Sequence, residues 1–410
     1  MTAGKLVAVI MIFLATAIGW AVLGGVTRAR TDVAARDLGG AVATLWGTEQ
    51  IQTAPTVAYM YKSQEKKRDP GTKKMLTREV TSWSPVPLSA SQVQADFRLD
   101  YRKKGLLWFS TYEVQFNGRY SASNPLDKPT TVRVDFSFPS QRGVYDAFVY
   151  TVNGTDVSSS GGQTTGRSAT LQVGPKEALK IEVGYKTRGL SRWLYCFGPG
   201  VTNVKEFTLV ASTDFKNIDF PAETLSPSSP RETTRGWELT WSFASLVSGA
   251  AIGLQMPERL NPGPIASRIS FFAPVSLLFF FTLLLTVGMA RGVNLHPMHY
   301  FFLAAAFFAF DLLFAYLVDQ IDINLAFVIS AIASLALVIG YLRAVVNWRF
   351  ALRTAGLAQL VFLILFSYAF FYQEYTGLTI AIGAVLTLAI LMHITASVKW
   401  DDVFAPRRPA

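Results

Sequence analysis

The chain has 410 residues, of which 50% are hydrophobic and 16% charged, and its formal net charge is +10. These totals exclude a disordered chain and a collagen, and a single cysteine, Cys196, excludes a disulfide scaffold. Charge is unevenly distributed: residues 27–267 hold 29 basic and 22 acidic side chains, whereas residues 269–398 hold eight charged side chains in total. So long a region with so few charges is typical of helices in a bilayer, so the sequence predicts an integral membrane protein.

The first predicted element is an apolar segment, Leu6–Val26, whose 21 residues include no charge. Roughly 20 residues are needed for a helix to cross the hydrocarbon core. A cleaved signal peptide is the alternative, because Lys5 precedes the segment and small residues follow it. The apolar part of a signal peptide is shorter, about 7–15 residues, so we expect residues 1–26 to be an uncleaved membrane anchor.

Residues 27–267 change to a period of two, in which apolar and polar residues alternate, and this pattern predicts strands with one buried face. The predicted strands are Tyr112–Phe116, Val132–Phe138, Val144–Val152, Ala169–Val173, Leu179–Tyr185, Phe207–Ala211 and Trp237–Phe243. Asn117-Gly118 and Asn153-Gly154 are favoured turn dipeptides. We therefore expect a large antiparallel β-sandwich-like domain inserted after the first helix, followed by a stiff proline-rich linker at Pro257–Pro264.

One basic run stands out within this region, because seven cations fall within seventeen positions. They are Lys62, Lys66, Lys67, Arg68, Lys73, Lys74 and Arg78. One interpretation is a surface that binds anionic lipid headgroups or anionic wall polymers. The other, which we favour, is a solvated hairpin with Pro70-Gly71 at its tip, because surface charge commonly serves solubility. Nucleic acid is not an expected partner on that side of the membrane.

Residues 268–400 predict a bundle of five further membrane helices. The predicted spans are Ile269–Ala290, Tyr300–Val318, Ile323–Leu342, Thr354–Tyr372 and Thr376–Ser397. With the first segment they make six transmembrane helices, arranged as one plus five. Their connections are short, so consecutive helices are expected to be antiparallel neighbours.

The charges of the connections predict the orientation of the bundle. The basic residues on one side are Arg291, Arg343, Arg349, Arg353, Lys399, Arg407 and Arg408. The other two connections hold Asp319, Asp322 and Glu374 and no basic residue. By the positive-inside rule the basic side is cytoplasmic. We therefore expect both termini, including a tail at residues 401–410, to be cytoplasmic, and residues 27–267 to lie outside.

A search for catalytic motifs finds no phosphate-binding loop, dinucleotide fingerprint, nucleophile elbow or zinc knuckle. His296, His299 and His393 lie at similar predicted depth on the cytoplasmic side. Three imidazoles can bind a metal, but no cysteine joins them there, and we expect ordinary histidines that cap helix ends. The sequence thus predicts no metal, no cofactor, no catalytic residue and no enzymatic activity.

Asp311 is the one chemically unusual residue of the membrane region, since it lies inside a predicted span among phenylalanines and leucines. A carboxylate at that depth is costly, so it is expected to face the bundle interior and to be paired or protonated. By residue type, its expected partners are Tyr341, Tyr368, Ser367 or Asn347. A structural bond between two helices is the favoured interpretation, and a relay carboxylate of an ion- or proton-coupled transporter is the alternative.

Several stretches taken together resemble the CreD family of bacterial inner-membrane proteins. They are Leu45-Trp46-Gly47-Thr48-Glu49-Gln50 followed by Pro55, the stretch Phe207–Phe243, His296-Pro297-Met298-His299-Tyr300, and Met392-His393-Ile394-Thr395 before Lys399-Trp400. The order of one helix, a large domain and five helices is also similar. At the hairpin where the family usually has glutamate and histidine, this chain has Asp319-Gln320.

The resemblance implies an inner-membrane location, a periplasmic domain and a part in cell-envelope integrity, with links to responses to wall-active antibiotics. It brings no catalytic residues. We therefore expect a non-enzymatic envelope protein whose periplasmic domain binds a protein partner or an envelope polymer. The alternative is an ion- or proton-coupled transporter, or a lipid-handling protein, that uses Asp311. The sequence does not predict an oligomeric state.

Overall fold

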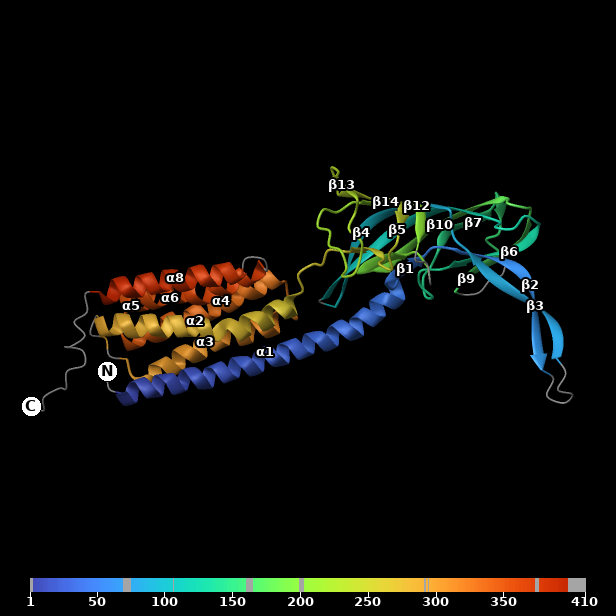
Figure 1. The fold of residues 1–410 in the computed structure, drawn as a ribbon. Helices are drawn as coiled ribbons and strands as arrows, with labels where there is room; N and C mark the ends of the chain where they lie inside the picture. Colours follow the sequence, from blue (N-terminus) through green and yellow to red (C-terminus); the bar gives the residue numbers. More distant parts are fainter. Residues whose placement is uncertain are drawn as a thin grey trace, which may run out of the picture. The chain divides into compact units, whose positions relative to one another are not determined.

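The computed structural model describes residues 3–68, 75–105, 107–159, 165–198, 203–290, 293, 295–372 and 376–396. The chain forms two compact units, one from Met1–Asp37 with Leu260–Ala410 and the other from Leu38–Arg259 (Figure 1). Hydropathy places these boundaries at residues 27 and 267. The unit boundaries differ from these positions because hydropathy marks where charged residues begin and end. The helices at both boundaries extend beyond the apolar segments into charged or polar sequence.

Helix α1 (Ala3–Trp46) shows this most clearly, because its 44 residues far exceed the 21 of the apolar segment. At 1.5 Å per residue it is about 66 Å long. The part after Val26 is rich in alanine, a strong helix former, and Arg28 lies 4.0 Å from Asp32 one turn away. Charged residues therefore continue the helix rather than ending it.

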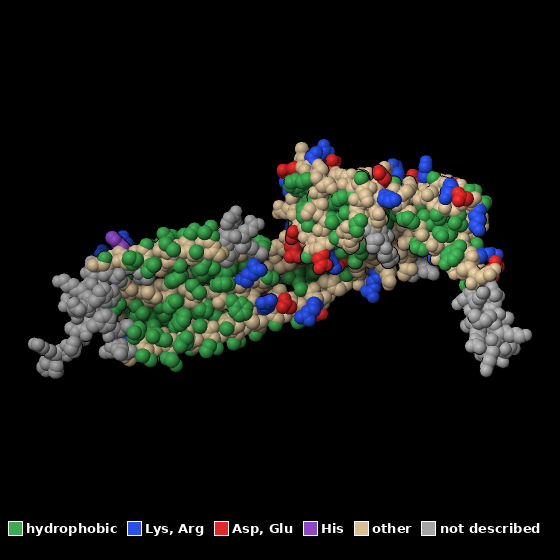
Figure 2. All heavy atoms as spheres, viewed as in Figure 1, with side chains coloured by type: hydrophobic (Ala, Val, Ile, Leu, Met, Phe, Trp, Pro, Cys, Tyr) green, Lys and Arg blue, Asp and Glu red, His purple; other side chains and the backbone are tan. Residues whose placement is uncertain are grey.

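The other helices of this unit are α2 (Pro262–Ala290), α3 (Pro297–Leu317), α4 (Ile323–Val345) and α8 (Thr376–Thr395), with a composite helix between α4 and α8. In the described residues, five helical stretches are long and apolar enough to cross a membrane, namely α1, α2, α3, α4 and Trp348–Phe371. In α8 the apolar stretch is Ile380–Ile390. Hydrophobic side chains cover the visible face of these helices, whereas acidic and basic side chains are scattered over the β-rich unit (Figure 2).

The composite helix is irregular along its length. It consists of α5 (Trp348–Phe350), η1 (Ala351–Gly356), α6 (Leu357–Gln359), η2 (Leu360–Leu365), α7 (Phe366–Tyr368) and η3 (Ala369–Phe371). Both η1 and η2 are π-helical, with backbone bonds to the fifth residue, and η3 is a 3₁₀ turn. Such π-helical turns are rare in proteins, and those that occur are often found at functional sites. The helix begins earlier than the predicted Thr354, because Asn347 caps it by accepting from Phe350 N at 2.8 Å.

The other unit contains fifteen strands in its described residues. They are β1 (Gln50–Thr53), β2 (Thr56–Arg68), β3 (Met75–Val86), β4 (Ala90–Lys104), β5 (Leu107–Ser123), β6 (Thr130–Ser137), β7 (Asp146–Val152), β8 (Thr155–Asp156), β9 (Gly166–Val173), β10 (Ala178–Leu190), β11 (Arg192–Cys196), β12 (Val204–Thr213), β13 (Ser229–Glu232), β14 (Trp237–Leu246) and β15 (Ile252–Gln255). Every predicted strand lies within one of them or extends at most two residues beyond it.

The strands form three sheets that share one hydrophobic core. The orders are β1-β11-β15, β13-β14-β12-β4-β5-β10-β7-β8 and β3-β2-β6-β9. Phe136 of the four-stranded sheet packs 6.4 Å from Tyr185 of the eight-stranded sheet, and Trp193 of the small sheet packs 5.2 Å from Phe97. Side chains of all three sheets thus exclude water from the same interior.

Two predictions about this unit are wrong in detail. Asn117-Gly118 makes no turn, because β5 continues through it and pairs with β4 and β10 on both sides. Two full ladders of backbone hydrogen bonds outweigh a dipeptide preference. The sheets are also not purely antiparallel, since β1 pairs with β11 and β4 with β12 in parallel. The turn at Asn153-Gly154 is confirmed, with φ of 50° and 78°.

The end of α1 is joined to the β-rich unit through the residues that carry the family resemblance. Gly47 has φ +108°, and a Cβ there would lie 2.4 Å from Arg188 O. The buried amide of Gln50 donates to Thr48 O at 3.0 Å and to Arg188 O at 3.2 Å. Glu49 pairs with Arg192 at 2.7 Å. These residues therefore fix the chain as it turns from helix into strand.

This joint predicts that Gly47→Ala lowers the stability of the β-rich unit by about 1–3 kcal/mol, because alanine strains the positive φ and meets Arg188 O. The matched control is Gly40→Ala in α1, where a Cβ meets no atom within 4 Å. That change is expected to be neutral or to stabilise the helix by about 0.5–1 kcal/mol. Thermal unfolding of the full-length variants in detergent measures both, and equal unfolding temperatures would contradict the joint.

Candidate functional site

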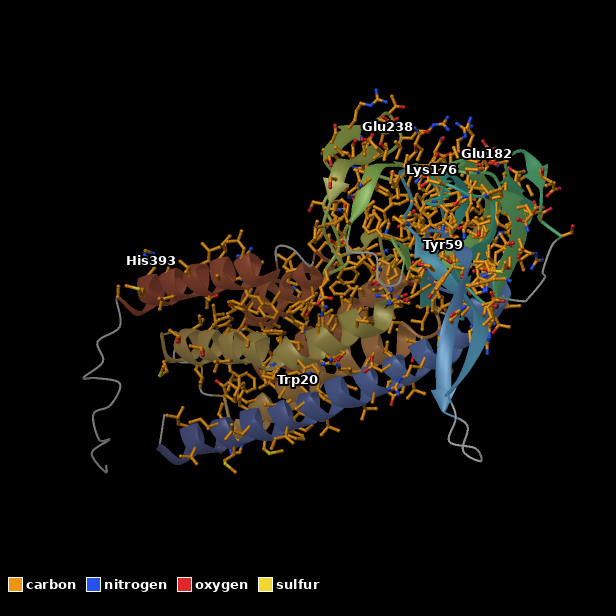
Figure 3. All side chains as sticks on the ribbon, turned by 45° about the vertical axis from the view of Figure 1, so that its right-hand side comes forward. Trp20, Tyr59, Lys176, Glu182, Glu238 and His393 are labelled. Carbon is orange, nitrogen blue, oxygen red and sulfur yellow. The ribbon has the colours of Figure 1, made fainter. Side chains whose placement is uncertain are left out.

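Asp311 on α3 is 1% exposed and its carboxylate accepts a hydrogen bond from the indole N–H of Trp20 on α1. The distance from Trp20 Nε1 to Asp311 Oδ2 is 2.9 Å, and Trp20 is itself fully buried. Figure 3 labels Trp20 on α1. The second oxygen, Oδ1, is buried and has no hydrogen-bond partner among the described residues. The site is therefore a buried carboxyl group with one donor.

This geometry confirms that Asp311 faces the bundle interior but corrects its predicted partners. Tyr341 Oη lies 2.7 Å from His299 Nδ1, and Asn347 caps the composite helix. Tyr368 stacks on Phe371, with ring centroids 5.2 Å apart. The true partner comes from the first helix, 291 positions away in sequence. The expected partners are all polar residues of the five-helix region and therefore do not include Trp20. A tryptophan within a membrane span is usually counted as apolar, although its indole N–H can donate a hydrogen bond.

Arg30 joins α1 to the end of α3 at a second place. Its guanidinium donates to Ala315 O at 2.8 Å, pairs with Asp319 at 2.6 Å and stacks over the ring of Tyr316 at 4.9 Å. A planar fork that donates, pairs and stacks at once is specific to arginine. Together with the Trp20 bond, these interactions fix α1 and α3 side by side in one register. The two helices run in the same direction (Figure 1).

A further polar group lies between α4 and the composite helix. Gln359, fully buried, donates from Nε2 to Ser334 Oγ at 2.7 Å, and Ser334 donates to Ala306 O at 2.7 Å. Ser276 of α2 donates to Phe362 O, within the π-helical turn η2. These bonds give the three donor groups a partner that the bilayer does not offer, whereas Gln359 Oε1 is buried without a partner among the described residues. They link helices and do not reach Asp311 in any described interaction.

Two of the three histidines, His296 and His299, make side-chain interactions at the start of α3. His296 caps α3, because its Nδ1 accepts from Met298 N at 3.3 Å. His296 and His299 rings are 6.4 Å apart, and no group of three metal-binding side chains occurs in the part of the chain that the structure describes. Capping thus accounts for His296, and the Tyr341 interaction accounts for His299.

Most side chains of the basic run are not described. Lys62 is exposed on β2 and pairs with Glu79 at 3.3 Å. The side chains of Lys66, Lys67, Arg68 and Arg78, and the whole of Lys73 and Lys74, are not described. The antiparallel pairing of β2 with β3 over this run agrees with the predicted hairpin. Its role in binding an anionic surface stays a prediction.

The β-rich unit carries a feature that no motif predicts, a groove on the outer face of the eight-stranded sheet. Two hollows of about 820 Å³ and about 860 Å³ adjoin there, since both are lined by Gln115, Lys186 and Ser212. We call them together the outer-face groove. Because strand residues alternate, the same strands send apolar side chains to the core and polar ones into the groove.

One half of the groove is rich in neutral amides, and we call it the amide half. Gln94 of β4, Asn117 of β5 and Gly184 of β10 lie directly opposite one another, and Gln92 and Gln115 flank this row. Glu182 and Glu238, which also line this half, lie on the same outer side of the unit in Figure 3. Asn117 and Gln115 make no side-chain hydrogen bond among the described residues, so their amides face solvent.

The other half, the arginine half, has an excess of cations without partners. Arg98, Arg142, Lys186 and Arg235 line it from four separate segments, and within the described residues none makes an ion pair. Its four acidic groups are occupied. Glu113 pairs with Arg188 at 3.0 Å, Asp214 accepts from Leu99 N, Asp146 from Ala147 N, and Asp96 from Gln94. The arginine half thus holds five cations and four carboxylates, and four of its cations form no ion pair among the described residues.

The loop that carries Arg142 is held firmly. Tyr145 Oη donates to Ser140 O at 2.7 Å and accepts from Ser140 N at 2.8 Å. Burial raises the pKa of Tyr145 to about 12, so the phenol stays neutral and keeps both bonds. Ser140 also bonds Thr48 at 2.6 Å, beside the end of α1. The position of Arg142 is thus set by the fold around it.

Comparison with known proteins agrees with this description. Residues 224–401 match the family model described as "Inner membrane protein CreD", so the resemblance seen in the sequence is confirmed over that range. It runs from the last strands of the β-rich unit through the membrane helices. No curated protein sequence matches the chain.

One solved structure, a proposed nutrient binding protein from Legionella pneumophila, shares 12% identity over 66% of this chain and 85% of its own. Its TM-score is 0.35, too low to support an inference about fold or function.

The Trp20–Asp311 bond predicts that Trp20→Phe destabilises the bundle by about 1–3 kcal/mol, because phenylalanine keeps the ring but leaves the buried carboxyl without its donor. In an Asp311→Leu background the same change is expected to have little effect. Thermal unfolding in detergent of the two single variants and the double variant measures this coupling. Trp348→Phe, at a position that is 52% exposed, is the control. Equal effects of Trp20→Phe in both backgrounds would disprove the bond.

Proposed function

We propose that this chain is an inner-membrane protein that maintains the cell envelope by binding a protein partner or an envelope polymer through its outer-face groove. In this proposal α1 and the five later helices each cross the membrane, and both termini are cytoplasmic. Residues 27–267 are periplasmic and form a sandwich-like domain. The role is linked to envelope stress and to the response to wall-active antibiotics.

The single observation that carries the binding role is the outer-face groove, where four cations lack ion-pair partners among the described residues and one of the four carboxylates of the arginine half is paired with Arg188. Unpaired cations in a hollow favour a bound anion, because the anion displaces water there and does not have to break an existing ion pair. The inner-membrane family match over residues 224–401 supports the location. A binding role also agrees with the lack of catalytic motifs in the sequence.

A second candidate function rests on Asp311. One of its carboxyl oxygens is buried without a partner in the described residues, as expected of a group that takes up and releases a proton. In this alternative the helices conduct ions or protons, or handle lipid. The Trp20 bond equally fits a structural role of Asp311, so an experiment has to distinguish the structural role from the proton-coupled one.

The topology part of the proposal predicts the activity of alkaline phosphatase fusions, since this enzyme is active only outside the cytoplasm. A fusion at Asp322, at the start of α4, is expected to be active. A fusion at Asn347, at its other end, is expected to be inactive, because the basic residues nearby mark the cytoplasmic side. The reverse pattern would refute the orientation, and two active or two inactive fusions would refute the crossing by α4.

The binding role predicts the outcome of complementation in a deletion strain challenged with a wall-active antibiotic. Full-length protein is expected to protect, and Arg98→Gln/Arg235→Gln to fail although it reaches the membrane at normal levels. The matched control is Lys128→Gln/Lys205→Gln, which removes two exposed charges outside the groove. Asp311→Asn still accepts from Trp20, and it is expected to protect.

Each alternative result points to one conclusion. If Asp311→Asn accumulates normally but does not protect, the ion- or proton-coupled function replaces the binding role. If the groove variant protects as well as its control, the groove is not the functional surface. Immunoblots of membrane fractions check that every variant is present in equal amounts.

A further inference from the structure

We propose that the outer-face groove binds an anionic glycan, a polysaccharide chain that carries carboxylate groups on acetylated sugars. This inference rests on the proposed function and names the chemistry of its ligand. The observation behind it is the combination of amide half and arginine half in one continuous hollow.

The size of the groove fits a chain rather than a single small ion. The amide half is lined by residues of six neighbouring strands, in the order β14-β12-β4-β5-β10-β7. Adjacent strands are about 4.8 Å apart, so this face is about 24 Å across. A phosphate or a free carboxylate would occupy only a small part of that length, whereas a run of several sugar rings would fill it.

The amide half matches the neutral part of such a chain. An amide side chain offers both a donor and an acceptor, so it can bond hydroxyl groups and acetamido groups alike. Asn117 and Gln115 are exposed and have no competing side-chain bond among the described residues, and the Asn117 amide lies over the neighbouring Gly184. Asn117 and Gln115 would be costly to cover with an apolar protein surface, because their amides would lose their bonds to water.

The arginine half matches the charged part. Arg98 and Arg188 lie on either side of Glu113 across β4, β5 and β10, and only Arg188 pairs with it. Arg98 is exposed and forms no ion pair among the described residues, so its guanidinium is available for a carboxylate. Trp46, half-buried, also lines this half, and Arg102 lies over one face of its ring at 5.8 Å, so the other face is the one on which a sugar can stack.

A protein partner is the less favoured occupant. Protein interfaces have an apolar core rich in aromatic residues, with charges at the rim. Among the described lining residues of the groove, charged and amide side chains outnumber the aromatic ones, which are Trp46, Phe97 and Tyr185. The chemistry of the lining therefore favours sugars and carboxylates over apolar side chains.

The test is equilibrium binding by the full-length protein in detergent, with three probes. The first is peptide-free glycan strands from bacterial cell walls, which are acetylated sugars that carry carboxylates. The second is chitin oligosaccharides, which have acetylated sugars without carboxylates. The third is poly-glutamate, which has carboxylates without sugars. The strands are expected to bind at least about tenfold more tightly than either other probe, because only they engage both halves.

Variants assign the two halves. Arg98→Gln/Arg235→Gln is expected to weaken binding of the strands about tenfold and to leave chitin binding unchanged, because only the charged interactions are lost. Asn117→Ala is expected to weaken binding of both. Lys128→Gln/Lys205→Gln, the control with equal loss of charge, is expected to change neither by more than about twofold.

Three results would overturn the proposal. One is the absence of strand binding by the parent protein. Another is poly-glutamate binding as tight as strand binding, together with no effect of Asn117→Ala, which would indicate a site for any polyanion. The third is unchanged strand binding by the groove variant. In each case the complementation experiment still decides the proposed function separately, because it does not depend on the class of ligand.

Discussion

The arrangement of the membrane unit depends on the cost of leaving a carboxyl group without a partner where water is excluded. Asp311 meets this constraint through the indole of Trp20, and that one bond joins the first helix of the chain to the third. Arg30 and Asp319 extend the same pairing to the end of α3. Polar interactions at two points along α1 therefore set its register against α3. Apolar packing alone would allow the two helices to slide past each other.

Hydrogen-bond donors in the rest of the bundle also find partners on neighbouring helices. Ser334, Gln359 and Ser276 each donate to an oxygen on a neighbouring helix, and two of these acceptors are backbone carbonyls. One of these acceptors, Phe362 O, lies in the π-helical turn η2 of the composite helix. At η2, helix irregularity and interhelical hydrogen bonding therefore coincide.

Much of the fold could be predicted from the sequence, because hydropathy and period two are properties of single segments. The strand at Val132–Phe138 and the cap at His296 follow from such local patterns. What the sequence could not supply was long-range pairing. The partner of Asp311 lies near the other end of the chain, Asn117-Gly118 is held in a strand by neighbours far away in sequence, and the groove is assembled from six strands. Helix α1 continues past Val26 because charged and alanine residues favour a helix as well as apolar ones do.

The alternation of the strands has a consequence for how such a domain can change over evolutionary time. On β5, Val114 and Phe116 are buried in the core, whereas Gln115 and Asn117 face the groove. Substitutions at the second set alter the recognition surface with little effect on folding, since these side chains contribute almost nothing to the packed interior. The sheet thus separates the positions that determine stability from those that determine selectivity. A scaffold of this kind can acquire a new ligand preference through a few surface changes while its architecture stays the same.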